Sequence, residues 1–254
     1  MKPILLEIGG LSFTSYGVSK VLAAVIAWWM IARELGRRGL DAGPAVALTV
    51  AGLIGGFVGA KLYYLAENSG SLTLHDLDGT GFTWYGGLIG GAAAVIVVSR
   101  RARLPLPLVA GVTAAPLAFA YGVGRLGCLL AGDGTYGVPS DLPWAMSFPH
   151  GAVPTLERVH PTPLYEALGA FLVGALLLRL RGRVSDGALF AISAVLMGLS
   201  RFLVEFVRLN KEVVFGLTQA QLWSVLLVAV GVTVGLAGIA RRPRTNRPAQ
   251  PART

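Results

Sequence analysis

Three charged residues near the C-terminal third of the chain have a spacing that suits anion binding. Arg201, Glu205 and Arg208 stand at positions i, i+4 and i+7, so one helix would carry them on one face. Two positive charges and one negative charge leave a net positive charge on that face. Arginine suits phosphate because its planar guanidinium donates two parallel hydrogen bonds. The alternative is a row of self-compensated ion pairs without a ligand.

A further arginine, Arg125, belongs to the segment "GRLGCLLAGDGTYG" at 124–137. Glycines follow it, and a glycine-rich backbone can bring its amides close to a ligand. Arg125 and Arg201 together would form a clamp for an anion. The alternative is that both side chains only anchor helices by reaching toward water.

A third polar cluster is the segment "HPTPLYEAL" at 160–168. Pro161 favours a helix start, which would place Tyr165 and Glu166 in the first turn beside His160. Glu166 could simply complement the helix N-terminus, and Tyr165 could belong to an aromatic belt. The local density of His, Tyr and Glu favours a binding site instead.

The composition shows which elements must position these residues. The chain of 254 residues is 54% hydrophobic and 14% charged, with a mean hydropathy of +0.65, which indicates a polytopic membrane protein. No cleavable signal peptide is expected. Runs of about 20 mostly apolar residues predict seven spans. These lie at roughly 14–33, 43–66, 85–99, 105–124, 161–178, 187–207 and 217–240.

The charges of the loops predict an orientation. Three arginines follow each of the first, third and fifth spans and five follow the seventh, together 14 of the 22 Lys and Arg. Loop 67–84 carries Glu67, Asp76 and Asp78 and no basic residue. This positive-inside pattern puts the N-terminus outside and the C-terminus in the cytoplasm. The anion clamp then lies where the outer side of the membrane meets water, and a phosphate there would belong to a phospholipid head group.

The predicted fold class is therefore an all-α polytopic membrane protein of about seven transmembrane helices. Residues 1–240 form one membrane domain, and loop 125–160 forms a small extracytoplasmic head between the fourth and fifth helices. The basic tail 241–254 is expected to be disordered near anionic lipid. It lacks interleaved aromatic residues, so we predict no nucleic-acid partner. The string "GLIGG" at 52–56 and 87–91 predicts close helix packing.

Cysteine and histidine usage limits the other chemistry. Cys128 is the only cysteine, which excludes an internal disulfide and a cysteine-built metal site. His75 and His150 show no metal-ligand spacing, and we predict neither a metal nor a cofactor. Cys128 has no base beside it in sequence, so it is interpreted as a buried apolar residue rather than a nucleophile.

Seven motifs in order make the chain resemble the prolipoprotein diacylglyceryl transferase family. They are "SYG" at 15–17, "GLIGGFVGAKLYY" at 52–64, "YGGLIGG" at 85–91, "GRLGCLLAGDGTYG" at 124–137, "HPTPLYEAL" at 160–168, "RFLVEFVR" at 201–208 and "GLTQAQLWS" at 216–224. The resemblance implies a multi-pass enzyme of the bacterial cytoplasmic membrane. Such enzymes move the diacylglyceryl group of phosphatidylglycerol onto the lipobox cysteine of a preprolipoprotein, forming a thioether and releasing glycerol phosphate.

The resemblance also implies roles for single residues. The catalytic set is Arg125, Arg201, Glu205 and Tyr85. The substrate-binding set is Tyr16, Gly86, Gly87, Gly127, Asp133, Gly137, His160, Tyr165, Glu166 and Arg208. The expected partners are phosphatidylglycerol, lipobox-containing preprolipoproteins and membrane lipids.

The chain departs from the family pattern at four positions. Tyr85 replaces the usual histidine of "HGG", Cys128 and Ala131 replace asparagines, and Asp133 replaces the usual glutamate. Tyrosine, with a pKa near 10, is a poor base at neutral pH, but it can donate a hydrogen bond to a phosphate or ester oxygen. Two alternatives stay open: a paralogue that uses another acceptor or lipid, and a non-enzymatic lipid-binding or transport protein.

Overall fold

Seven helices form the protein in the computed structural model, which describes residues 2–9, 11–70 and 83–240. They are α1 (Ser15–Arg37), α2 (Pro44–Glu67), α3 (Trp84–Arg101), α4 (Leu106–Ala131), α5 (Thr162–Leu180), α6 (Asp186–Glu205) and α7 (Gln219–Ala240). All of them except α3 are long and apolar enough to cross a membrane. The chain is an all-α multi-pass membrane protein. That α3 also crosses the membrane stays a prediction, as does the orientation of the bundle.

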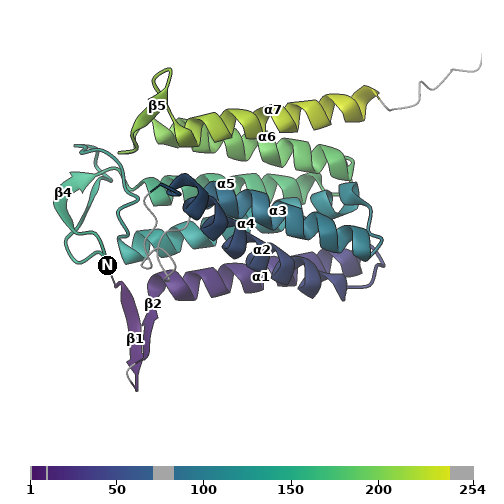
Figure 1. Ribbon diagram of the computed structural model, residues 1–254, viewed down its shortest axis with the longest axis horizontal. Helices are drawn as coiled ribbons and strands as arrows, with labels where there is room; N and C mark the ends of the chain where they lie inside the picture. Colours follow the sequence, from purple (N-terminus) through teal and green to yellow (C-terminus); the bar gives the residue numbers. More distant parts are fainter. Residues whose placement is uncertain (1, 10, 71–82, 241–254) are drawn as a thin grey trace, which may run out of the picture.

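Short two-stranded hairpins decorate one end of the bundle (Figure 1). They pair β1 (Ile4–Ile8) with β2 (Leu11–Thr14), β3 (Met146–Phe148) with β4 (Thr155–Val159), and β5 (Glu212–Val214) with β6 (Leu217–Thr218), each antiparallel. We call this the hairpin end. The opposite end of the bundle carries the turns after α1, α3 and α5, with Arg38, Arg103 and Arg181. We call it the arginine end.

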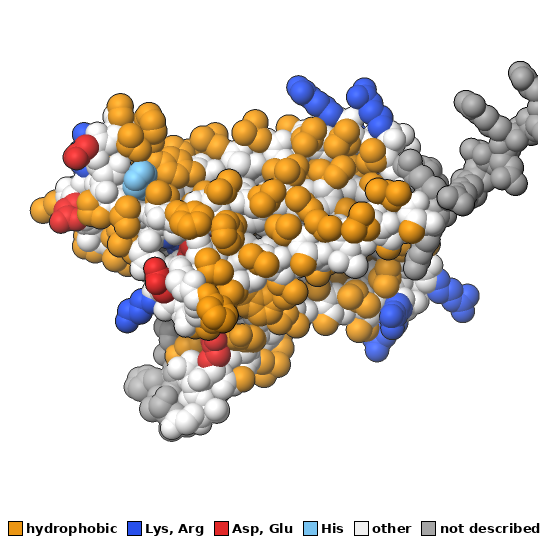
Figure 2. All heavy atoms as spheres, turned by 90° about the horizontal axis from the view of Figure 1, so that it is seen from above, with side chains coloured by type: hydrophobic (Ala, Val, Ile, Leu, Met, Phe, Trp, Pro, Cys, Tyr) orange, Lys and Arg blue, Asp and Glu red, His pale blue; other side chains and the backbone are white. Residues whose placement is uncertain are grey.

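The surface between the two ends is apolar. Figure 2 shows hydrophobic side chains along the length of the bundle, acidic side chains at the hairpin end, and most of the visible Lys and Arg at the other end. Large apolar side chains are exposed on the sides of the bundle, with Leu172 72% exposed and Leu236 63% exposed. Such a continuous apolar surface is unfavourable in water, whereas the acyl chains of lipids solvate it.

Helix α4 lies at the centre of the bundle and packs against α1, α5 and α6. Toward the arginine end, its Val109 and Val112 join Leu35 of α1 and Leu48 of α2 in one buried cluster. Further along, Ala114, Ala115 and Ala118 pack against α5 and α6. These contacts fix α4 relative to three neighbours, and α4 carries Arg125.

Glycines bring α2 and α3 into backbone contact. A Cβ on Gly86 would meet the carbonyl oxygen of Gly59, and one on Gly90 would meet that of Gly55. The predicted packing role of both "GLIGG" strings is therefore confirmed. The same contacts account for Gly86 without a ligand.

The fourth helix is longer than the predicted span. It runs to Ala131 rather than to residue 124 and ends at Gly132, whose φ of 59° is left-handed. Gly124 and Gly127 did not break it, because lipid favours helical backbone bonds and Gly127 sits where α1 approaches closely, at Ser19. The segment between α4 and α5 thus begins at Gly132 rather than at residue 125.

The segment between α4 and α5 folds around a small core of its own. Tyr136 stacks on Phe148 with ring centroids 5.0 Å apart, and Val159 completes the core. The Val138 amide donates to the Val207 carbonyl at 2.9 Å, which ties this head to the end of α6. The predicted tail 241–254, and His75, Asp76 and Asp78 of loop 67–84, lie outside the described residues.

Candidate active site

Two arginines and a glutamate from three helices meet at the hairpin end. Arg125 of α4 places Nε 2.5 Å from Glu166 Oε2 of α5. Arg201 of α6 donates from Nη1 to Glu166 Oε1 at 2.8 Å. Glu166 is only 2% exposed and therefore depends on both guanidinium groups for its charge. The predicted pair of arginines is brought together, with a carboxylate between them.

A second buried carboxylate joins the same cluster. Glu205, 3% exposed, has Oε2 at 2.7 Å from Arg201 Nη1. Arg208 lies slightly further away, with Nη1 3.6 Å from Glu166 and Nε 3.7 Å from Glu205. We call Arg125, Glu166, Arg201, Glu205 and Arg208 the arginine–glutamate cluster. Its three positive and two negative charges leave a net charge of +1.

Arg208 is the least satisfied member of this cluster. Its Nε and Nη1 are buried and have no hydrogen-bond acceptor among the described residues. Burial lowers the pKa of Arg208, and the positive charge of Arg201 lowers it further. An anion bound beside Arg208 would relieve both effects, because it would supply an acceptor and a compensating charge.

The helical spacing predicted for these residues holds only in part. Arg201 and Glu205 lie on α6 at i and i+4 and form an ion pair, but α6 ends at Glu205. Arg208 lies in the following turn, where its backbone bridges to Gly137 of the head. Glu166 is the fifth residue of α5 and so lies just past the first turn, which contains no acidic residue.

Helix α7 holds Glu205 through a cap that the sequence analysis did not identify. The Gln221 amide donates to Thr218 Oγ1, and the Thr218 amide donates to Gln221 Oε1, which is a reciprocal capping box. Thr218 Oγ1 also donates to Glu205 Oε1 at 2.9 Å, and Asn210 Nδ2 donates to the same oxygen at 2.5 Å. The pattern T-x-x-Q at 218–221 was the available signal.

Aromatic side chains flank the cluster. The guanidinium of Arg125 lies 5.0 Å from the ring centroid of Tyr121, one turn earlier on α4, a contact the sequence analysis missed although the i, i+4 spacing indicates it. Tyr85 stacks on Trp223 of α7 with centroids 5.1 Å apart. Arg201 and Glu205 are close enough to Tyr85 to interact with it electrostatically.

His160 and Tyr165 form a separate group beside the head. Tyr165 Oη accepts a hydrogen bond from Trp144 Nε1 at 2.7 Å and lies 3.2 Å from His160 Nδ1. Asp133 Oδ1 accepts from the Thr135 hydroxyl at 2.6 Å, so this carboxylate stabilises a local turn. The structure pairs none of these three predicted residues with the arginine–glutamate cluster.

The remaining predicted residues have structural surroundings of their own. Tyr16 is 44% exposed in the first turn of α1, with the Lys20 ammonium 4.8 Å from its ring centroid. A Cβ on Gly87 would lie 3.3 Å from the Gly56 carbonyl oxygen. A Cβ on Gly137 would meet the Val207 carbonyl oxygen. These glycines allow close backbone packing, and their contact with substrate stays a prediction.

Comparison with known proteins identifies the family of the chain. Residues 3–237 match the family described as prolipoprotein diacylglyceryl transferase. A relative from Clostridium tetani named phosphatidylglycerol–prolipoprotein diacylglyceryl transferase is 31% identical, covering 92% of this chain and 96% of its own. Proteins of the same name from Geobacter sulfurreducens and Synechococcus elongatus are 32% and 31% identical, covering 92% and 97% of this chain and 94% and 92% of theirs. With a match over nearly its whole length, the chain belongs to the prolipoprotein diacylglyceryl transferase family.

Proposed function

We propose that this protein transfers the diacylglyceryl group of phosphatidylglycerol to the lipobox cysteine of a preprolipoprotein in the bacterial cytoplasmic membrane. The observation that carries the proposal is the arginine–glutamate cluster, which is buried, has a net charge of +1 and contains the unsatisfied donors of Arg208. Such a site suits a phosphodiester with a single negative charge. The hairpin end then faces outward, as the positive-inside pattern predicts.

The proposed reaction is a displacement at carbon. The sulfur of the acceptor cysteine forms a bond to the terminal glyceryl carbon, and the bond from that carbon to the phosphate oxygen breaks. The electron pair of the broken bond stays on the phosphate, which leaves as glycerol phosphate and gains negative charge. Arg125, Arg201 and Arg208 stabilise this growing charge in surroundings of low dielectric.

The thiol proton does not require either buried glutamate as its acceptor. Glu166 is ion-paired with Arg125 and Arg201, and Glu205 accepts bonds from Thr218 and Asn210, so both carboxylates already serve to position the arginines. A free cysteine has a pKa near 8.5, and a few per cent of it is thiolate at pH 7. We therefore propose that the thiol loses its proton to water before attack, and that Tyr85 donates a hydrogen bond to a phosphate or ester oxygen.

The test is an assay of the purified protein with phosphatidylglycerol and a lipobox peptide. We expect the thioether-linked peptide and glycerol phosphate in equal amounts. A peptide with the lipobox cysteine replaced by serine is the matched control and should give no product. Normal lipid binding without either product would reject the enzymatic function and favour a lipid-binding protein.

Tyr85 supports one second candidate, a paralogue that acts on another acceptor or lipid. This residue stands where the family resemblance leads us to expect histidine. Expression in a bacterial strain depleted of its own transferase distinguishes the two. Full rescue of growth would remove the reason for a different acceptor, whereas failure by a stable, membrane-inserted protein would favour it.

A further inference from the structure

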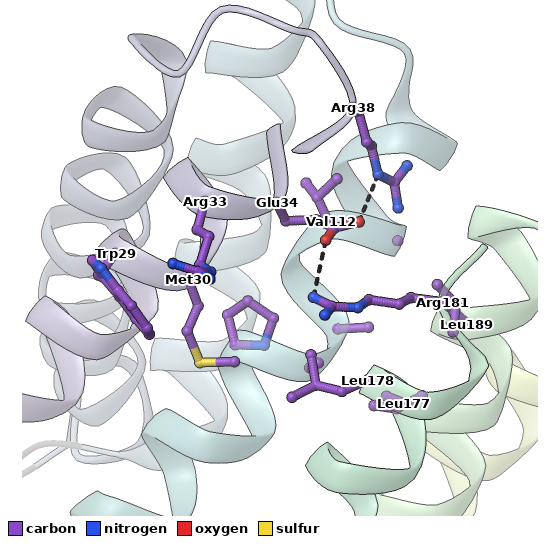
Figure 3. A pocket seen from close by; sticks show the side chains of 14 residues that line it. Trp29, Met30, Arg33, Glu34, Arg38, Val112, Leu177, Leu178, Arg181 and Leu189 are labelled. Atoms are coloured by element: carbon purple, nitrogen blue, oxygen red, sulfur yellow. Dashed lines mark hydrogen bonds and ion pairs between the residues drawn. The ribbon is translucent and has the colours of Figure 1, made fainter. Parts of the chain in front are cut away.

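A cavity lies away from the arginine–glutamate cluster, at the arginine end of the bundle. It has a volume of ≈ 160 Å³ and lies between α1, α4, α5 and α6 (Figure 3). Its wall on α4 runs from Gly111 to Pro116, at least nine residues before Arg125. Nine helical residues rise roughly 14 Å, so the two sites lie at different depths of the bundle.

The inner wall of this cavity is apolar. Met30, Ala115, Pro116 and Leu178 are among the residues that line it. Pro116 lies inside α4 and has no amide hydrogen, so the carbonyl group of Val112 loses its helical partner there. Ligand pockets for drug-sized molecules hold roughly 300–1,000 Å³. This cavity is smaller and fits a segment of a hydrocarbon chain.

The rim of the cavity carries an excess of positive charge. Glu34 is 8% exposed and already accepts two short bonds from Arg37, at 2.8 and 2.7 Å, and one from Arg38 at 2.7 Å. Arg38 also donates to both oxygens of Asp186. These two carboxylates are therefore satisfied without the remaining rim cations.

The two remaining rim arginines keep free donors. Arg181 reaches Glu34 only at 3.3 Å, and its side chain is 39% exposed. Arg33 is exposed, and its guanidinium carbon lies 5.5 Å from the centroid of the Trp29 ring. Figure 3 shows Arg33 and Arg181 on opposite sides of the cavity. Two exposed guanidinium groups above an apolar cavity match a phosphate joined to a hydrocarbon chain.

We propose that this cavity binds an acyl chain of an anionic phospholipid whose phosphate contacts Arg33 and Arg181. The occupant comes from the membrane leaflet at the arginine end, so it is distinct from a substrate lipid bound by the arginine–glutamate cluster. Charge complementarity selects an anionic lipid over a zwitterionic one, and the apolar wall selects a lipid over a free phosphate. The proposal does not depend on the proposed transferase activity.

Native mass spectrometry of the full-length protein in detergent tests the site. The probes are phosphatidic acid and phosphatidylcholine with the same acyl chains. The R33Q/R181Q variant should bind one phosphatidic acid fewer than the parent, or bind it with a dissociation constant raised on the order of tenfold, while phosphatidylcholine binding stays unchanged. Both replaced side chains lie at the surface, so the variant is expected to fold.

The matched control is R100Q/R101Q, which removes the same charge from the same end of the bundle, on α3 outside the cavity. It should change phosphatidic acid binding by less than about threefold, since its charges act only through the general surface potential. Equal losses in both double variants would overturn the proposal, because binding would then follow surface charge alone.

Two further measurements test the acyl chain separately from the phosphate. Ala115→Leu fills the cavity wall while it keeps both arginines, so it should also weaken phosphatidic acid binding. Glycerol phosphate, which lacks acyl chains, should not displace the lipid at millimolar concentration. Parent-like binding by a folded Ala115→Leu variant, or effective displacement by glycerol phosphate, would overturn the proposal.

Discussion

Arg201 offers the sharpest test of the proposed chemistry, because one of its nitrogen atoms contacts both buried carboxylates. Nη1 lies 2.8 Å from Glu166 Oε1 and 2.7 Å from Glu205 Oε2. Arg201→Ala changes the net charge of the arginine–glutamate cluster from +1 to 0. It removes a donor from the phosphate and leaves Glu205 with Arg208 as its remaining ion-pair partner, at 3.7 Å.

The magnitude follows from two costs. Removing one preorganised donor from a developing oxyanion costs about 2.7–4 kcal/mol, or about 10²–10³-fold in kcat. Breaking a buried ion pair by removing one partner costs about 3–5 kcal/mol of stability. Because Arg125 and Arg208 remain beside the carboxylates, we expect the stability loss near the lower end of that range. The activity loss should therefore exceed what reduced folding alone explains.

The assay is initial-rate kinetics of thioether formation in phosphatidylglycerol micelles, with thermal unfolding measured on the same samples. Arg201→Lys keeps the charge but presents a single ammonium in place of the planar fork, so it should regain the stability and only part of the rate. Arg179→Ala is the control, since Arg179 is exposed near the end of α5 at the arginine end. A folded Arg201→Ala protein with more than about a tenth of parent activity would refute the proposed role.

Four further outcomes follow from the same contacts. Tyr85→Phe should lower kcat in the same assay while the stack on Trp223 is kept, and full activity would exclude a role for the hydroxyl group. Cys128→Ser should reduce activity less than threefold, since a buried serine can bond to a helical carbonyl group; an inactive but folded variant would show that the thiol matters. Thr218→Val should lower the free energy of unfolding by about 1–2 kcal/mol, because the α7 cap and the bond to Glu205 are lost. An unchanged midpoint of thermal or chemical unfolding would contradict the role of Thr218 as a cap. Gly86→Ala should destabilise the protein by about 1–3 kcal/mol, because the new methyl group meets the Gly59 carbonyl oxygen, and parent-like stability would mean that α2 and α3 can separate at no cost.

The sequence predicted the helices because lipid imposes a simple rule on them. Long apolar runs must be helical, and arginines mark alternate helix ends, as after α1 and α5. The helix ends were less predictable, since glycine has two meanings in such a chain. Gly127 allows close contact with Ser19 within α4, whereas Gly132 ends that helix with a left-handed backbone. Only the packing of α1 against α4 distinguishes them.

The candidate site was predictable residue by residue but not as an arrangement. Arg201 indicates an anion site because it lies inside a predicted span, where arginine is costly, and Arg125 and Arg208 add guanidinium groups at the ends of predicted spans. The placement of Glu166 between Arg125 and Arg201 requires α4, α5 and α6 to be mutual neighbours. A local sequence pattern does not predict which helices are neighbours. For the same reason the sequence could assign His160 and Tyr165 to the substrate-binding set but could not show that they contact each other and that Tyr165 also contacts Trp144 of the head.

The two glutamates explain how three arginines can be held together in the interior of the protein. Three buried positive charges alone would repel one another and would each lose hydration, a cost that grows steeply in low dielectric. Glu166 and Glu205 remove most of that repulsion and fix the guanidinium groups from two sides. They leave one positive charge uncompensated and two Arg208 donors without an acceptor. In the proposed reaction, a bound phosphodiester would restore neutrality, and the second charge that the phosphate gains on leaving would make its interaction with the arginines stronger than that of the substrate. Under this proposal the arrangement favours the transition state over the bound lipid, which is the condition for catalysis by charge stabilisation.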